Sequence, residues 1–275
     1  WLARGPPPLL PDQNRLYSVY NTLPVEARCG GHTDRENFWE VDAIYQWLLT
    51  ALREEFEAAR LLKESPRGTV ALVRHRSTGR RFILRRFRGS AEVYRALLDC
   101  ACPNLPQVLE VASRGEDHLV LEEFIQGDTL DFLLRDGRFS PRETRKIAGQ
   151  LCRALWVLHT LGAVHRDVKP ENVILRGGEA VLIDFDAARL RKPDHRTDTQ
   201  VLGTTGFAAP EQYGLSQSDI RTDIYSLGIL INVMLTGEHP SKRLADGRMG
   251  RIVDRCTHVN PQRRYKNVLR LMEAL

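Results

Sequence analysis

The sequence has no apolar run long enough to cross a membrane and no internal repeat. A helix needs about 18 or more apolar residues to span a bilayer, so no transmembrane helix is predicted within this segment. The start also lacks the basic stretch followed by an apolar stretch that is typical of a signal peptide. Because residue 1 is Trp rather than Met, we expect a piece of a longer chain. We therefore predict a cytoplasmic protein, or the cytoplasmic domain of a longer membrane protein.

Cysteine is scarce, and a strong excess of one charge is missing. The five cysteines lack metal-ligand spacing, and the C-x-C pair Cys100 and Cys102 has no His within ten residues. This pattern favours reduced thiols, with a zinc site as the weaker alternative. There are 40 Lys and Arg residues against 35 Asp and Glu residues, which gives a net charge of +5. That modest excess permits an anionic partner without requiring one.

What is present is an ordinary globular composition, with 42% apolar and 27% charged residues. Residues 1–55 read as an N-terminal extension that contains an amphipathic helix at about 34–55, where apolar residues recur at steps of three and four. We interpret this helix as packed on the following domain; a docking or dimerisation helix is the alternative. From 56 to 125 the period falls towards two, and from 126 to 275 the pattern is mainly helical. This predicts an α+β chain with a small antiparallel sheet lobe and a larger helical lobe.

A dense run of polar residues, H-R-D-V-K-P-E-N at 165–172, lies between two long predicted helices. A short apolar strand, a Gly-Gly turn and a second strand follow, and the second strand ends in D-F-D at 184–186. Neighbouring strand ends would bring together two carboxylates and a carboxamide, from Asp167, Asp184 and Asn172. Such oxygen ligands suit Mg²⁺ together with phosphate oxygens. Lys169 is close enough in sequence to reach a transferring phosphoryl group.

These residues resemble the catalytic-loop and metal-loop signature of eukaryotic-type protein kinases, H-R-D-x-K-P-x-N followed by D-F-x. Three more motifs follow in family order: A-A-P-E at 208–211, D-I-Y-S-L-G at 223–228 and P-Q-R-R-Y at 261–265. The resemblance covers about residues 56–275 and implies a two-lobed protein-kinase-like fold, with the small lobe at 56–125 and the large lobe at 126–275. Lys169 and the Gly-Thr before A-P-E are similar to the serine/threonine form, and several phrases look like those of Gram-positive bacteria.

The resemblance implies a role for each large-lobe residue. Asp167 would accept the proton of the substrate hydroxyl, Lys169 would neutralise charge on the γ-phosphoryl group of ATP, and Asn172 and Asp184 would hold Mg²⁺, or Mn²⁺ as an alternative. The implied supporting roles are an Arg166 that braces the activation segment, a Thr204 that bridges Asp167 and Lys169, a buried Glu211–Arg264 ion pair and an Asp223 that holds the catalytic loop. Thr197, Thr199 and Thr205 lie between Asp184 and Glu211, where a phosphate could pair with Arg166; they are either regulatory phosphorylation sites or plain solvated loop residues.

The small lobe departs from the family pattern. The lysine of V-A-I-K falls on Arg85, and its expected partner Glu92 follows only seven residues later. In the phosphate-covering loop, placed at 63–70, Gly68 alone remains of three glycines. The other nucleotide-binding residues that the resemblance implies are Val70, Ile83, Glu123, Ile125 and Ile174. The hinge register puts Glu122 at the gatekeeper position, or Leu121 if it shifts by one, and Asp186 replaces the Gly of D-F-G.

We therefore predict a serine/threonine protein kinase that transfers the γ-phosphoryl group of ATP to a protein hydroxyl. The large-lobe residues that match the family motifs favour activity. The departures in the small lobe, Arg85 at the lysine position and the loss of two glycines, favour the alternative, a pseudokinase or nucleotide-sensing scaffold. A small-molecule phosphotransferase would not be expected to keep A-P-E. The expected partners are a protein substrate and a nucleotide, with a homodimer left open. Nucleic acid is not expected, because the arginines from 74 to 88 lack interleaved aromatic residues; binding of RNA or anionic lipid is the alternative to a solvated strand face.

Overall fold

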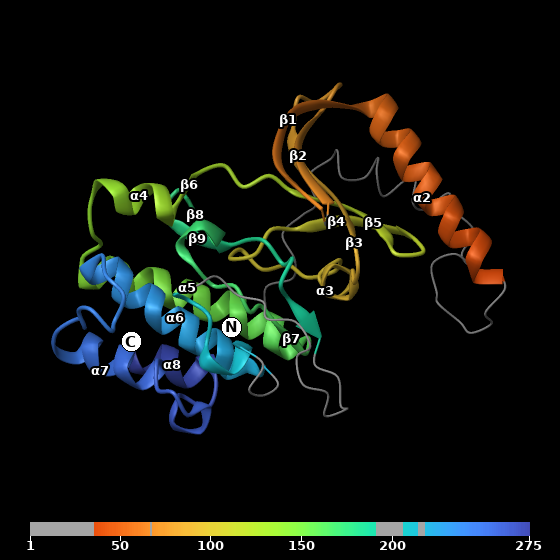
Figure 1. Ribbon diagram of the computed structural model, residues 1–275. Coiled ribbons are helices and arrows are strands. Elements are labelled where there is room, and N and C mark those ends of the chain that lie inside the picture. Colours follow the sequence, from red (N-terminus) through yellow and green to blue (C-terminus); the bar gives the residue numbers. More distant parts are fainter. Residues whose placement is uncertain (1–35, 67, 191–205, 214–217) are drawn as a thin grey trace, which may run out of the picture. The chain divides into compact units, whose positions relative to one another are not determined.

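The computed structural model describes residues 36–66, 68–190, 206–213 and 218–275, with side chains from Tyr45 onward (Figure 1). The chain divides into two compact units. The small unit comprises the described residues up to Gly89 together with Glu110–Val120, and the large unit comprises Ser90–Leu109 and the described residues from Leu121 onward. The predicted extension and lobes divide the chain differently, because the helix of the extension belongs to the small unit.

The small unit is built on an antiparallel sheet whose strand order is β1-β2-β3-β5-β4. Helix α2 (Glu36–Glu55) runs directly into β1 (Phe56–Ser65). The other strands are β2 (Gly68–His75), β3 (Arg81–Arg88), β4 (Val108–Arg114) and β5 (Asp117–Glu123), and the last two extend into the large unit at one end. The strands predicted near residues 71, 82, 107 and 118 are confirmed, and α2 confirms the predicted helix over its described residues.

The loop expected at 63–70 is mostly strand. Lys63 pairs with Val70 and Ser65 pairs with Gly68, so only Pro66 and residue 67 lie between the two strands. Pro66 has no backbone N–H and cannot donate to a ladder, which is consistent with the end of β1 at Ser65. Gly68 has a φ of +156°, and a Cβ here would overlap the carbonyl oxygen of Arg86 on β3. The glycine is therefore required by the close approach of two strands.

The large unit is mainly helical: α5 packs against α6, α8 packs against α5 and α7 packs against α6 (Figure 1). Its helices are α3 (Glu92–Ala96), α4 (Leu130–Asp136), α5 (Pro141–Thr160), α6 (Ile220–Thr236), α7 (Gly247–Cys256) and α8 (Val268–Ala274). Ser140 and Glu143 form a capping box at the start of α5, with Pro141 in the first turn. Helix α6 ends at Gly237, whose φ of +79° favours glycine. None of the described helices combines the length and apolar composition that a membrane crossing requires.

Short strands in the large unit position the polar run found in the sequence. Strands β8 (Val173–Arg176) and β9 (Glu179–Leu182) form a hairpin, and β6 (Asp128–Thr129) pairs with β8. Strand β7 (Ala163–Val164) pairs with β10 (Arg189–Leu190). The loop at 165–172 therefore starts at one small sheet and ends at another. The residues Thr197, Thr199, Thr204 and Thr205 lie outside the described part of the chain.

Candidate active site

Asp223, in the first turn of α6, holds the backbone of the 165–172 loop as predicted. The backbone N–H groups of His165 and Arg166 donate to its carboxylate at 3.0 and 2.7 Å. His159, in the last turn of α5, contacts the same carboxylate through Nε2 at 2.8 Å. Complete burial by itself raises the pKa of Asp223, but the hydrogen bond and charge of His159, the charge of His165 and the backbone hydrogen bond from Arg166 together hold the pKa below its usual value. The carboxylate therefore stays ionised and anchors the loop.

Two residues of this region have a strained backbone. Arg166 has a φ of +70° and Asp184 a φ of +68°, which side-chain-bearing residues rarely adopt. Such a conformation costs about 1–3 kcal/mol and persists where neighbouring contacts over-determine it. At Arg166 those contacts include Asp223 on its N–H and the Gln212 side chain, whose Nε2 donates to its carbonyl oxygen at 2.9 Å. Sequence reasoning gave no role to Gln212, because this contact joins residues 46 positions apart.

Asp167, Lys169 and Asn172 converge within the loop. Lys169 Nζ lies 2.8 Å from Asp167 Oδ2, and Asn172 Nδ2 donates to the same oxygen at 2.9 Å. Asn172 Nδ2 also donates to the Asp167 carbonyl oxygen at 2.9 Å, which fixes the backbone beside the carboxylate. The Asp167 N–H lies 3.3 Å from His165 Nδ1. Burial holds the pKa of His165 below its usual value, so the neutral ring can accept this bond.

The β8–β9 hairpin brings Asn172 and Asp184 to one end. Val173 pairs with Leu182, and the Ile183 N–H donates to the Asn172 carbonyl oxygen at 2.9 Å. Because Asn172 uses its side-chain N–H groups on Asp167, its side-chain oxygen remains as the acceptor of the amide. Mg²⁺ is commonly held by one or two such oxygen ligands together with phosphate oxygens and water. The donor set of Asn172 and Asp184 fits this ion.

Aromatic contacts join α3 to the D-F-D segment at 184–186 and to the loop at 165–172. The Tyr94 ring meets Phe185 edge-on at 5.7 Å between centroids, and Phe185 meets His165 in the same way at 5.7 Å. The Tyr94 hydroxyl donates to Asp186 Oδ1 at 3.5 Å, and the Asp186 N–H donates to Asp184 Oδ1 at 3.3 Å. The residue that replaces the family glycine thus lies in a chain of contacts from α3 to Asp184. Tyr94 lies in the phrase E-V-Y-R, which belongs to the family resemblance, but sequence reasoning gave it no role.

Glu92 is exposed on α3. Its carboxylate accepts a hydrogen bond from Ser90 Oγ at 3.1 Å. The helix covers five residues, fewer than the 90–99 segment predicted, and the side chain of its N-cap residue Ala91 makes no capping hydrogen bond. Glu92 belongs to the large unit and Arg85 to the small unit, and their pairing stays a prediction.

The expected hinge is fixed to the hairpin by its side chains. Arg176 Nη1 on β8 lies 2.6 Å from Glu123 Oε1, and Arg176 also donates to the Pro103 carbonyl oxygen at 3.1 Å. Further along the chain, Thr129 of β6 pairs with Ile174 of β8. The predicted residue Glu123 therefore contacts β8 through Arg176, and the predicted residue Ile174 lies on β8 itself.

Burial in this segment does not choose between the two hinge registers. Leu121, Glu122 and Ile125 are all buried, so either Leu121 or Glu122 fits a buried gatekeeper position.

In the small unit, strand register places four predicted residues on one face. Val70 pairs with Arg85, and Gly68 with Phe87. Paired residues share a face and side chains alternate along a strand, so Gly68, Val70, Ile83 and Arg85 lie on the same side of β2 and β3. The Arg85 side chain is buried. The register therefore brings the buried Arg85 to the face that also carries Val70 and Ile83.

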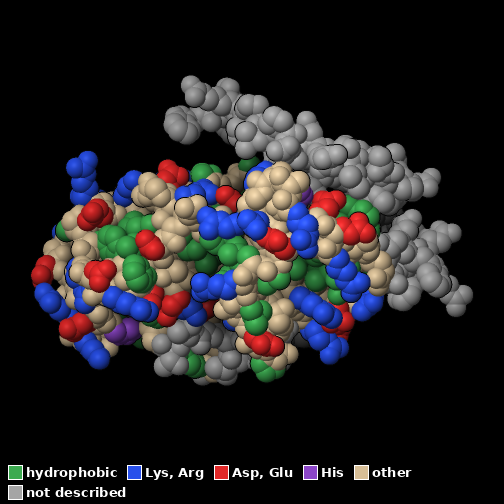
Figure 2. All heavy atoms as spheres, turned by 90° about the horizontal axis from the view of Figure 1, so that it is seen from above, with side chains coloured by type: hydrophobic (Ala, Val, Ile, Leu, Met, Phe, Trp, Pro, Cys, Tyr) green, Lys and Arg blue, Asp and Glu red, His purple; other side chains and the backbone are tan. Residues whose placement is uncertain are grey.

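Acidic side chains from other segments lie beside arginines of the 74–88 stretch. Arg74 Nε donates to Glu57 at 2.6 Å, and Arg88 lies 3.6 Å from Glu116 and 3.7 Å from Asp117. Figure 2, which views the molecule from above, shows Lys and Arg side chains mixed with Asp and Glu side chains over the surface that faces the viewer. These contacts favour a solvated strand face over a nucleic-acid surface.

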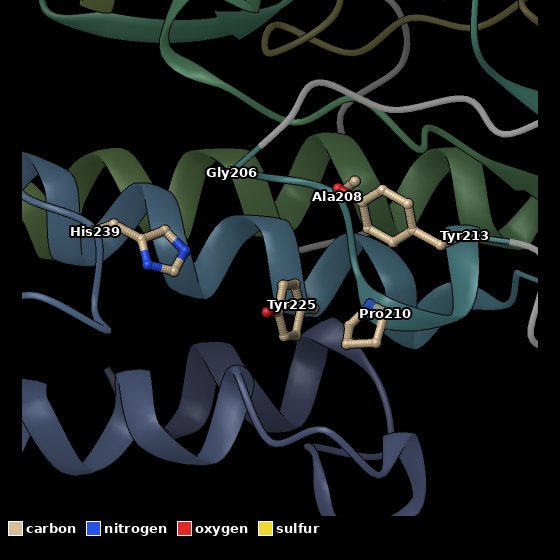
Figure 3. Close-up of a pocket in the computed structure, with 6 residues that line it drawn as sticks. All are labelled: Gly206, Ala208, Pro210, Tyr213, Tyr225 and His239. Atoms are coloured by element: carbon tan, nitrogen blue, oxygen red, sulfur yellow. The ribbon is translucent and has the colours of Figure 1, made fainter.

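The segment 206–213 is anchored through Glu211 to Arg264, which follows the short helix η4 (Pro261–Arg263). Glu211 and Arg264 form the predicted buried pair, with Nη1 and Nη2 donating to the two carboxylate oxygens at 2.6 and 2.9 Å. Beside this segment lies an open pocket of about 360 Å³ (Figure 3). Its lining residues are Gly206, Ala208, Pro210, Tyr213, Tyr225 and His239. Sequence reasoning did not find Tyr213 or His239, because they come from separate segments without a shared motif.

Comparison with known proteins gives one family and several relatives. The model of the family described as protein kinase domain matches residues 66–270. A serine/threonine-protein kinase of Myxococcus xanthus is 34% identical over 146 residues, which cover 50% of this chain and 18% of that protein. PknB of Mycolicibacterium smegmatis, also named a serine/threonine-protein kinase, is 35% identical over 167 residues, covering 56% and 26%. Serine/threonine-protein kinase C of Synechocystis is 30% identical over 198 residues, covering 63% and 37%. The chain spans well under half the length of these relatives.

Proposed function

The chain belongs to the protein kinase family, and we propose that it transfers the γ-phosphoryl group of ATP to a serine or threonine hydroxyl of a protein. The observation that carries this proposal is the Asp167 carboxylate, held at 2.8 Å by Lys169 and at 2.9 Å by Asn172. The relatives named above support the choice of serine and threonine.

In the proposed reaction, the substrate hydroxyl hydrogen-bonds to Asp167, which orients it and accepts its proton. The hydroxyl oxygen forms a bond to the γ-phosphorus, the bond to the bridging oxygen breaks, and ADP leaves. Lys169 places its positive charge next to Asp167, where it can also neutralise the transferring group. Asn172 and Asp184 would hold Mg²⁺, or Mn²⁺ in its place, and the ion would neutralise phosphate charge.

The family as a whole implies ATP, a divalent metal and a protein substrate. For this chain we propose that Gly68, Val70, Ile83 and Arg85 on the sheet face, with Glu123, Ile125 and Ile174, contact the nucleotide. We also keep Glu92 as the proposed partner of Arg85. The lobes at 56–125 and 126–275 are proposed as the functional division.

Labelled ATP with Mg²⁺ or Mn²⁺ tests the proposal through autophosphorylation and a mixed peptide library. Asp167→Asn keeps the shape of the side chain and removes the proton acceptor, so transfer should fall about 10²–10⁴-fold. The thermal shift caused by nucleotide should persist, because Asp167 is assigned to the hydroxyl. Glu171→Gln, an exposed acid in the same loop, is the matched control and should retain activity. A nucleotide-induced shift in the wild type with no transfer under either metal would instead support the pseudokinase alternative.

A further inference from the structure

Helix α2 precedes the region that matches the protein kinase family, yet it belongs to the small unit. It continues without a linker into β1, and Figure 1 shows it beside the sheet. We propose that α2 is a positioning element for strand β3 and, through that strand, for the nucleotide-binding side chain of Arg85. This inference rests on the proposed function, because it assigns Arg85 to the nucleotide.

The first observation is a small core shared by the helix and the sheet. Tyr45 and Leu48 of α2 are 1% and 4% exposed, and they pack with Ala112 of β4 and Leu119 of β5. Leu84 of β3 packs against the same cluster. One continuous apolar cluster therefore joins the helix to β4 and β5 and extends to Leu84 of β3, and burial stabilises it.

The second observation is the corner where α2 becomes β1. Phe56, the first residue of β1, is buried and meets the Phe82 ring edge-on at 5.6 Å between centroids. It meets the His75 ring in the same manner at 5.0 Å. The Arg76 N–H donates to the carbonyl oxygen of Glu55, the last helical residue, at 2.7 Å. The end of the helix is thus fixed to the β2–β3 hairpin by two ring contacts and a backbone hydrogen bond.

The third observation is the alternation of β3. Phe82 and Leu84 contact the corner and the α2 cluster, whereas Ile83 and Arg85 point to the opposite face, where Arg85 pairs with Val70. Contacts with α2 therefore alternate along one strand with the proposed nucleotide contacts. A shift of the strand towards a cavity left behind it would carry Arg85 with it, and misplacements of about 1 Å are enough to weaken a positioned contact.

The test uses Leu48→Ala, which leaves a cavity behind β3 because surrounding structure relaxes only in part. We expect the Kd for ADP, measured by calorimetry, to rise about tenfold. Leu48→Val, a smaller change, should give an intermediate increase and remains informative if Leu48→Ala does not fold. Gln46→Ala, on the exposed side of α2, should leave the Kd unchanged. Val253→Ala, a buried site in α7 of the large unit, should lower stability without weakening ADP binding.

A double variant separates positioning from a general loss of order. If α2 acts through Arg85, Leu48→Ala should change the ADP Kd less than twofold in an Arg85→Ala background. An equal effect in both backgrounds, or no effect of the Leu48 variants in the wild-type background, would overturn the inference and leave the proposed function standing. A wild-type chain that binds no nucleotide with Mg²⁺ or Mn²⁺ would overturn the proposed function, and this inference with it.

Discussion

Replacing Arg264 with Met removes the cation from a salt bridge that is almost completely buried. The Arg264 side chain is 0% exposed and the Glu211 side chain 5%, and two N–H groups donate to the two carboxylate oxygens at 2.6 and 2.9 Å. In the variant the carboxylate would keep the Thr222 hydroxyl, 3.1 Å away, as a hydrogen-bond donor. One neutral donor does not offset the desolvation of a buried charge, so the folded state should lose stability.

The magnitude follows from burial and from the other bonds of the guanidinium. Breaking a buried pair by removing one partner costs about 3–5 kcal/mol. Arg264 also donates to the carbonyl oxygens of His258, Arg221 and Val259 at 2.8, 3.0 and 3.2 Å, and Met satisfies none of them. The loss should therefore lie in the upper part of that range. For a protein of this size, about 2–4 °C per kcal/mol translates into a fall in Tm of roughly 10 °C or more.

Urea denaturation of the wild type and the Arg264→Met variant measures this loss. The matched control is Arg270→Met, because Arg270 and Glu273 form an ion pair at 2.7 Å whose side chains are 67% and 60% exposed. An exposed pair contributes about 0–1 kcal/mol, so this control should change little. If both variants cost the same, burial does not govern the strength of these pairs and the reasoning is refuted. Glu211→Leu combined with Arg264→Met should recover much of the loss, because no uncompensated charge then remains.

Three further outcomes follow from the site and the sheet. Asp223→Asn offers one acceptor oxygen where the loop needs two, so kcat should fall about 10–100-fold with little change in ADP affinity; the reverse split would contradict the anchoring role. Burial raises the pKa of Glu110 to about 7 from 4.5, so its contribution to stability is present below about pH 4.5 and lost as the pH rises through 7. Glu110→Gln should therefore raise the unfolding free energy by on the order of 2 kcal/mol at pH 8 and by little at pH 5, and an equal gain at both would refute this. Tyr94→Phe keeps the ring contact with Phe185 and loses the hydroxyl contact, so kcat should change less than about threefold, whereas Tyr94→Ala should lower it at least about tenfold. Equal losses in the two Tyr94 variants would show that the hydroxyl dominates.

The core of the candidate site was predictable from sequence because its parts are local. Asp167, Lys169 and Asn172 lie within one short loop, and Asp184 follows through a hairpin whose turn is marked by Gly177 and Gly178. Both glycines have positive φ, +57° and +84°, so the turn chemistry alone indicates where the chain reverses. Once the hairpin is placed, antiparallel pairing brings its two ends together.

Other parts of the site could not be predicted, because they depend on side chains far apart in sequence. His159 meets Asp223 across 64 positions, and Arg176 meets Glu123 across 53. No periodicity links such residues, and their contacts appear only when helices and strands have packed. The phosphate-covering loop shows a different limit. The family pattern of glycines placed a phosphate-covering loop at 63–70, whereas strand pairing continues as far as Ser65 and Gly68.

Burial supports the proposed assignment of Arg85 among the arginines of β3. Arg81, Arg86 and Arg88 are exposed, and Arg85, opposite Val70, is buried on the face of the predicted nucleotide contacts. A register shifted by one would put the exposed Arg86 in the lysine position instead. The guanidinium of Arg85 is wider and more rigid than the ammonium of lysine, so its hydrogen bonds depend more strongly on where the strand lies. The strand that carries this replacement is also the one backed by α2, a helix from before the family match. We therefore expect two features to act together: the α2 cluster that packs on one face of β3, and the Arg85 side chain on the other face, whose hydrogen bonds depend on the position of the strand.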